Sequence, residues 1–335
     1  MKLTFEQIKS ITSGAERIEE NNGAISFLRF TKAEEDAYQG SWLYPRTFAT
    51  SGIKLRFKTD AKAMNLKTRT ADIGYNTLYA FDVYENKKLI GQIKNYPEGT
   101  GRGDREKNKY PVGDAEGHFI FTEGEKVIEI YFPWSVKGEL LELSLEGETF
   151  FAPVKYNKKC LVYGDSITQG ATALSPSNAY IVRTSDWLDA ELINKAIGSE
   201  AYFPELLDAR SEGECPDYLI VSYGANDWAL RTYEEAEEKC REFWKKARVA
   251  FPFAKKFALT PIWYENKSIK AKLGDFCLIE KFITKVASEF DDVTVINCER
   301  FVPENSLLFD DGVHPTDEGF DYFYKELKAE LEKHI

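Results

Sequence analysis

The sequence predicts an α/β protein of two domains: an all-β sandwich of jelly-roll type over residues 1–150, a linker at 151–158, and a domain with a five-stranded parallel sheet over 159–335. Two observations predict this fold class. In the first half, short segments alternate apolar and polar residues with the period of two that β-strands have. In the second half, near-continuous apolar runs alternate with helix-like stretches, as in a parallel sheet covered on both faces. A length of 335 residues also suits two domains.

Alternation in the first half is clearest where Ile53, Leu55 and Phe57 are interleaved with charged residues. Turn signals such as Asn22-Gly23 and Glu123-Gly124 separate the segments. Many short strands without convincing long helices indicate a sandwich. We expect its strands, in chain order, at 25–30, 53–57, 64–68, 79–83, 89–93, 119–121, 127–132 and 140–145.

The second half predicts a regular succession of strands and helices. Apolar runs occur at 160–163, 191–197, 217–223, 256–262 and 293–297. Helix-like stretches lie near 176–190, 203–210, 232–250, 275–289 and 316–333. Because functional residues of open parallel sheets gather at the carboxyl ends of the strands, the loops that follow these runs are the expected site.

Composition disfavours several classes of partner. A net charge of −11 disfavours nucleic acid and anionic membrane surfaces. The first residues lack the apolar region of a secretory signal and no run of about 18 apolar residues occurs, so we expect a cytoplasmic protein without membrane contact. The five cysteines are widely spaced and form no C-x-x-C pair, which argues against disulfides and a zinc site. No coiled-coil heptad or exposed apolar stripe marks an oligomer interface.

Ser166 is the candidate nucleophile. It lies in Gly164-Asp165-Ser166, between an apolar run and a helix-like segment, where unpaired backbone N–H groups of a helix start are close by. Of the three histidines, His334 is the penultimate residue and His118 lies in the other domain, so His314 is the candidate base. These residue types suit acyl transfer to a serine.

Asp311 stands three residues before His314, a spacing that brings its carboxylate to the imidazole Nδ1–H and fixes the tautomer. Asp310 is the rival partner at a less suitable spacing. Three donors can serve an oxyanion: the backbone N–H of Ser166, the backbone N–H of Gly198 and the side-chain amide of Asn226. This chemistry requires no metal or cofactor.

Together these residues resemble a known family. Gly164-Asp165-Ser166, Gly198, Gly224-x-Asn226-Asp227 and Asp311-x-x-His314 match, in order, the four blocks of the SGNH hydrolases, or GDSL-type esterases and lipases. The resemblance implies a flavodoxin-like three-layer α/β/α domain, a triad of Ser166, His314 and Asp311, and an oxyanion hole of Ser166, Gly198 and Asn226. We interpret Asp165 and Asp227 as hydrogen bonders that hold the loops. A preceding β-sandwich also resembles the two-domain carbohydrate acetylesterases of this superfamily.

Aromatic residues suggest the substrate. Trp42, Trp228, Trp263 and Tyr264 are candidates for the wall of a pocket, because aromatic rings pack on the flat faces of sugars. Core, lid or interdomain packing is the alternative for each. The expected reaction is hydrolysis of a small acyl ester, first of all an acetyl ester on a sugar or oligosaccharide. A lysophospholipase or thioesterase activity is the closer alternative, and a carbohydrate-binding protein with an inactive hydrolase domain is the more distant one.

Overall fold

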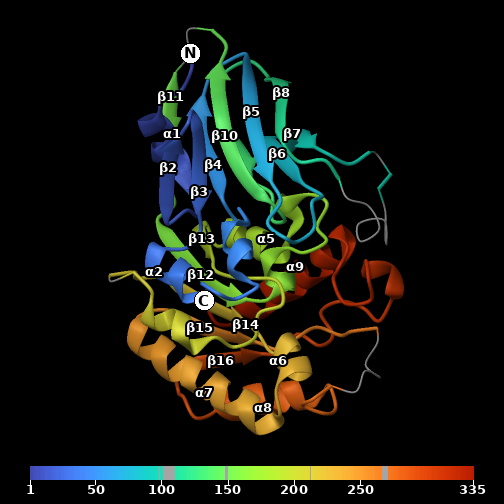
Figure 1. Ribbon diagram of the computed structural model, residues 1–335. Coiled ribbons are helices and arrows are strands. Elements are labelled where there is room, and N and C mark those ends of the chain that lie inside the picture. Colours follow the sequence, from blue (N-terminus) through green and yellow to red (C-terminus); the bar gives the residue numbers. More distant parts are fainter. Residues whose placement is uncertain (98, 101–109, 148–149, 212, 266–270) are drawn as a thin grey trace. The chain divides into compact units, whose positions relative to one another are not determined.

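The computed structural model describes residues 1–97, 99–100, 110–147, 150–211, 213–265 and 271–335 (Figure 1). The chain divides into two compact units. The β unit comprises residues 1–30, 45–157 and 174–177, and the α/β unit comprises 31–44, 158–173 and 178–335. The main boundary, between Asn157 and Lys158, lies at the end of the linker expected from the sequence. Two short segments belong to a different unit from their neighbours in sequence: 31–44 belongs to the α/β unit and 174–177 to the β unit. Segment 31–44 is the one that matters for the site.

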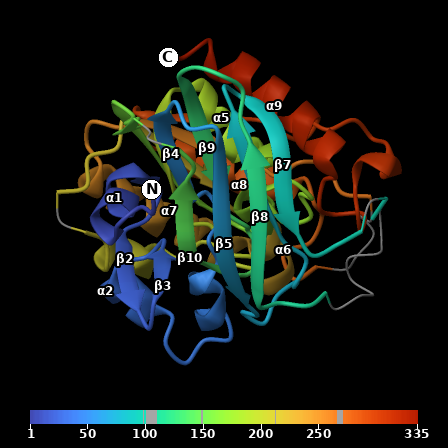
Figure 2. The same ribbon diagram turned by 90° about the horizontal axis from the view of Figure 1, so that it is seen from above.

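The β unit is a sandwich of two antiparallel sheets. One has the order β2 (Arg17–Asn21), β3 (Ala24–Leu28), β10 (Lys137–Leu145), β5 (Ala63–Ala71) and β8 (Asp114–Ile120), and Figure 2 shows β5 and β8 running side by side. The other has the order β1 (Thr12–Ser13), β4 (Lys54–Thr59), β9 (Lys126–Tyr131), β6 (Ala80–Glu85) and β7 (Lys88–Lys94), with β11 (Phe151–Pro153) paired to β4. All eight expected strands are present. The helix α1 (Phe5–Ile11) and the strands β1, β2 and β11 were not predicted.

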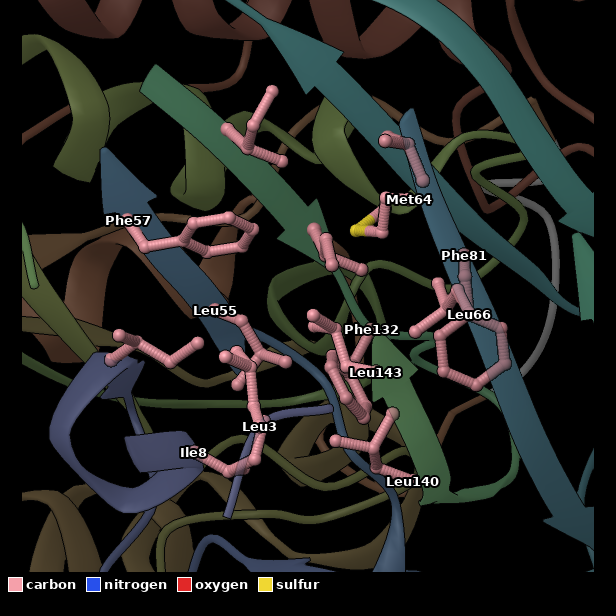
Figure 3. Close-up of a cluster of buried hydrophobic side chains, with 14 of the residues drawn as sticks. Leu3, Ile8, Leu55, Phe57, Met64, Leu66, Phe81, Phe132, Leu140 and Leu143 are labelled. Carbon is pink, nitrogen blue, oxygen red and sulfur yellow. The ribbon is translucent and has the colours of Figure 1, made fainter. Parts of the chain in front are cut away.

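Alternation along the strands explains the core of this unit. On β4, Leu55 and Phe57 are fully buried, whereas Arg56 between them and Lys58 after them remain partly exposed. Figure 3 shows these two apolar side chains together with Met64 and Leu66 of β5, one pair from each sheet. Burying a side chain of this size stabilises the fold by about 1.5–3 kcal/mol, so a one-residue shift of register would forfeit several such contributions at once.

The α/β unit is built on a five-stranded parallel sheet, as the sequence predicts. Its order is β13 (Ala190–Asn194), β12 (Lys158–Gly164), β14 (Tyr218–Ser222), β15 (Lys255–Leu259) and β16 (Val293–Ile296), which is the flavodoxin-like order 2-1-3-4-5. Four longer helices cover it: α5 (Tyr180–Trp187) packs with α9 (Asp317–Leu331), and α7 (Tyr233–Ala250) packs with α8 (Leu278–Ala287) (Figure 1). The fold class is therefore confirmed.

Four short helical segments differ from the expectation. The stretch predicted as a helix at 203–210 is a 3₁₀ turn, Pro204–Asp208. The helices α4 (Ser166–Gln169) and α6 (Ala225–Leu230) are too short to leave a periodic signal, yet both follow strand ends at the predicted site. The helix α2 (Lys32–Ala37) comes from the first half of the sequence but belongs to the α/β unit (Figure 1).

Candidate active site

Ser166 is the first residue of α4, and only Asp165 separates it from the buried end of strand β12. The Asp165 side chain caps this helix by accepting a hydrogen bond from the backbone N–H of Ile167 at 3.0 Å. A side chain at Gly164 would meet Thr168 Oγ1 at 2.7 Å and the Ser222 carbonyl oxygen at 2.9 Å, so this position requires glycine. The turn therefore places the serine hydroxyl at the carboxyl end of the sheet and at the start of a helix.

The predicted base and its partner lie in line with Ser166. Ser166 Oγ and His314 Nε2 are 2.7 Å apart, and His314 Nδ1 and Asp311 Oδ2 are also 2.7 Å apart. Both distances lie within hydrogen-bonding range, and with the proton on Nδ1 the Nε2 atom can accept the proton of the serine. The three side chains thus form a continuous relay of hydrogen bonds within one unit.

The loop itself holds Asp311 in place. Its Oδ1 atom accepts the backbone N–H groups of Val313 at 2.9 Å and His314 at 2.8 Å. Burial would raise the pKa of Asp311, but the hydrogen bond and charge of His314, together with these two N–H groups, lower it to about 2. Asp311 is therefore ionised at any ordinary pH. Asp310 instead donates its backbone N–H to the His314 carbonyl oxygen at 2.8 Å.

The side-chain amide of Asn226 meets the loop after β13. Asn226, on α6, donates from Nδ2 to the Glu200 carbonyl oxygen at 2.8 Å. A primary amide has two N–H groups, so the second can serve an oxyanion. Gly224, just before α6, has a φ of +118°, and a side chain there would meet Ile279 Cγ2 at 2.7 Å. The turn that orients Asn226 thus depends on a glycine.

Gly198 is bonded in a way that the sequence does not reveal. Its backbone N–H donates to Gln169 Oε1 at 2.6 Å, and Gln169 is a fully buried residue of α4. The next residue, Ser199, has a φ of +72°, which lies in the left-handed region that residues other than glycine rarely adopt. Strained residues of this kind gather at functional sites. Neither Gln169 nor Ser199 was singled out from the sequence, since Gln169 is distinguished only by its side-chain hydrogen bond and Ser199 only by its backbone φ.

The two aspartates interpreted as holding the loops make such contacts. Burial raises the pKa of Asp165 to about 6 in spite of the hydrogen bonds that it accepts. Asp227 accepts the backbone N–H of Tyr202 at 3.2 Å and forms an ion pair with Arg231, while its burial raises its pKa. Asp165 thus braces α4, and Asp227 joins α6 to the segment around Tyr202.

The four candidate aromatic residues are in the α/β unit but in different environments. Trp42 is 64% exposed. Trp228 is only 4% exposed, its Nε1 donates to the Gly274 carbonyl oxygen at 2.7 Å, and its ring packs against the ring of Tyr264, which is 7% exposed. Trp263 is half-buried against Phe309. Burial of Trp228 and Tyr264 favours the packing alternative for these two, and Trp42 presents the most accessible ring.

The remaining histidines lie apart from this relay. His118 is on the exposed face of β8, with Nε2 3.0 Å from Glu146 Oε1, and the ring of His334 lies beside that of Phe257 near the end of the chain. Within the part of the chain that the structure describes, no three His, Cys, Asp or Glu side chains are grouped so that they could hold a metal ion. No helix in that part is long and apolar enough to cross a membrane.

Comparisons with known proteins concern the family and the fold. Residues 162–322 match the model of the GDSL-like lipase/acylhydrolase family. Curated protein sequences give no match. The fold is similar to that of the salicylyl-acyltransferase SsfX3 from a tetracycline biosynthetic pathway, with a TM-score of 0.81, 17% identity, and coverage of 96% of this chain and 94% of that one.

Two further solved structures share the fold. A candidate GDSL-like lipase from Bacteroides ovatus has a TM-score of 0.79 and 17% identity, and the match covers 99% of this chain and 97% of that one. A family two carbohydrate esterase from Clostridium thermocellum, in complex with cellohexaose, has a TM-score of 0.64 and 13% identity, with coverage of 85% and 93%. At these identities the likeness concerns the fold alone.

Proposed function

We propose that this protein is a serine esterase that removes small acyl groups, first of all acetyl groups, from sugars or oligosaccharides. The match of residues 162–322 to the model of the GDSL-like lipase/acylhydrolase family supports this proposal. The observation that supports the chemistry best is the relay from Ser166 Oγ through His314 to Asp311, with both distances at 2.7 Å. The family match supports esterase activity in general, and the triad roles and the substrate are our more specific proposal.

In the proposed cycle, His314 takes the proton of Ser166 while the serine oxygen attacks the ester carbonyl carbon. Asp311 keeps the imidazole in the required tautomer and stabilises the imidazolium that forms. The Ser166 backbone N–H and the Asn226 amide stabilise the oxyanion, with Gly198 as a third donor if Gln169 releases it. The alcohol leaves with the proton from His314, and a water molecule activated by the same histidine then hydrolyses the acyl-enzyme.

Two observations support a sugar ester as the substrate. One structure with the same fold, the family two carbohydrate esterase, is in complex with cellohexaose. In this chain, the exposed ring of Trp42 is of the kind that packs on sugar faces. A lysophospholipase or thioesterase would use the same relay, so the acyl chain and the alcohol have to be determined by assay.

The decisive experiment compares the wild type with Ser166→Ala. We expect the wild type to hydrolyse p-nitrophenyl acetate, to release acetate from acetylated oligosaccharides and to react with a fluorophosphonate probe at Ser166. The variant should lose nearly all turnover and all labelling. Wild-type rates in the variant would overturn the assignment of the nucleophile, and absence of labelling in the folded wild type would favour an inactive, sugar-binding domain. A rate maximum at octanoate or longer esters would favour the lipase alternative.

A further inference from the structure

The hydrogen bond that orients Asn226 ends on a residue outside the sequence motifs. Its acceptor is the carbonyl oxygen of Glu200, at 2.8 Å from Asn226 Nδ2. Glu200 is only 2% exposed and lies in the loop that follows β13. An acidic side chain buried to this degree needs partners for its own oxygens.

Two buried tyrosines supply these partners. The hydroxyl of Tyr38 donates to Glu200 Oε1 at 2.5 Å, and the hydroxyl of Tyr223 donates to Oε2 at 2.9 Å. The tyrosines are 2% and 1% exposed. Burial, with the charge of Glu200, raises the pKa of both hydroxyls well above 10, so both stay protonated and continue to donate at working pH.

The three segments that meet at Glu200 are far apart in the chain. Tyr38 ends α2, Glu200 follows β13, and Tyr223 follows β14 and precedes α6, the helix of Asn226. The hydrogen bond from Tyr38 thus joins a helix from the first half of the sequence to the loop beside the candidate site.

A second buried contact ties α2 to the same loop. Lys195 Nζ lies 2.6 Å from Glu34 Oε2, and both side chains are fully buried. The same Oε2 atom accepts the backbone N–H of Thr31 at 2.8 Å in the capping box of α2. A buried pair of this kind adds little net stability, but it fixes the partners relative to each other. Two independent buried contacts therefore hold the loop at 195–200 against α2.

We propose that Glu200, held by Tyr38 and Tyr223, is a positioning residue for the oxyanion donor Asn226, and that segment 31–44 is in this way part of the catalytic machinery. The proposal rests on the proposed esterase function. The Glu200 carbonyl selects one orientation of the Asn226 amide, which leaves the other N–H for the oxyanion. Donors that are fixed in advance avoid the cost of reorganisation during the reaction. The tyrosines act on the transition state through Asn226.

The test is a double-mutant cycle with p-nitrophenyl acetate. Tyr38→Phe removes only one hydroxyl, and we expect it to lower kcat about tenfold with KM changed less than twofold. Tyr223→Phe should behave in the same way. Tyr218→Phe is the matched control, because it removes a tyrosine hydroxyl of the same unit, one that accepts a part-buried hydrogen bond from Lys158 Nζ at 3.3 Å, at the amino end of β14. The kcat of this variant should not change. Melting temperatures of all variants report whether the fold is retained.

The cycle is completed in the Asn226→Ala background, where kcat itself should be about 10²–10³ lower. If Tyr38 acts through Asn226, then Tyr38→Phe should lower kcat less than twofold further there. An equal, tenfold loss in both backgrounds, or no loss in either, would overturn the positioning role. Failure of the esterase function is distinguishable, because the wild type would then show no Ser166-dependent turnover at all, and the positioning role would fail with it.

Discussion

Replacing Asp311 by asparagine tests the proposed relay at the group that sets the tautomer of His314. The substitution keeps size and shape, and an amide oxygen can still accept the backbone N–H groups of Val313 and His314 that now bind Oδ1. The amide nitrogen, however, then takes the place of Oδ2, 2.7 Å from His314 Nδ1. Because that nitrogen can only donate, the imidazole proton moves to Nε2, which can no longer accept the proton of Ser166.

The expected loss in kcat is therefore large. Inverting the tautomer and removing the anion that faces the imidazolium reduces kcat about 10⁴-fold in other Ser-His-Asp relays, or about 5 kcal/mol of transition-state stabilisation. The pKa of Asp311, lowered to about 2, shows that His314 and the backbone N–H groups stabilise the ionised carboxylate. The same interaction strengthens when the imidazole becomes charged.

The assay is steady-state hydrolysis of p-nitrophenyl acetate at neutral pH, with Asp310→Asn as the matched control from the same loop. We expect Asp310→Asn to keep kcat within about tenfold, because Asp311 is the carboxylate in contact with Nδ1. A folded Asp311→Asn variant with kcat within tenfold of the wild type would refute the reasoning. It would mean that Ser166 and His314 suffice and that the aspartate only shapes the loop.

Two further predictions concern buried groups around the site. Because burial raises the pKa of Asp165 to about 6 from 3.8, its contribution to the unfolding free energy is full below pH 3.8 and is lost as pH rises through 6. In urea unfolding, the free energy of unfolding of the wild type should therefore fall by up to about 3 kcal/mol between pH 4 and 7.5 on account of Asp165, and Asp165→Asn should abolish this fall. The same pH dependence in the variant and the wild type would contradict the prediction. Trp228→Phe loses the hydrogen bond to Gly274 and should cost about 1 kcal/mol of stability without changing KM. A raised KM at unchanged stability would instead identify Trp228 as a pocket wall.

Local patterns predicted most of the fold because the forces that form each element act over short stretches of sequence. Leu55 and Phe57 alternate with charged residues, and this alternation assigns the β4 faces in the structure. The relay could also be predicted from the sequence, since Asp311 and His314 are three residues apart and the sequence has only three histidines. The positioning role that we propose for segment 31–44 could not be predicted from the sequence. Tyr38 contacts Glu200 across 162 residues of sequence, and no local pattern encodes such a contact.

The aromatic residues show a second limit. Trp228 follows Asn226 and Asp227 directly, which places it near the site in sequence. Its side-chain direction, however, depends on α6, a helix of six residues without a detectable period. On this helix the indole is buried against Tyr264 and Phe276, so proximity in sequence does not make it a wall of the site. Trp42 keeps its ring exposed because it lies in an irregular segment between α2 and a 3₁₀ turn.

The sequence motif identifies Gly198 but does not reveal the hydrogen bond that its backbone N–H makes. The family resemblance assigns its N–H to the oxyanion, but that N–H is 2.6 Å from Gln169 Oε1. An oxyanion is a stronger acceptor than a neutral amide oxygen, so it can compete for this donor, yet only if the buried Gln169 side chain gives way. Asn226 needs no such rearrangement, because its second N–H remains after the bond to Glu200. Oxyanion stabilisation should therefore depend more on Asn226, and on the tyrosines that hold its acceptor, than on Gly198.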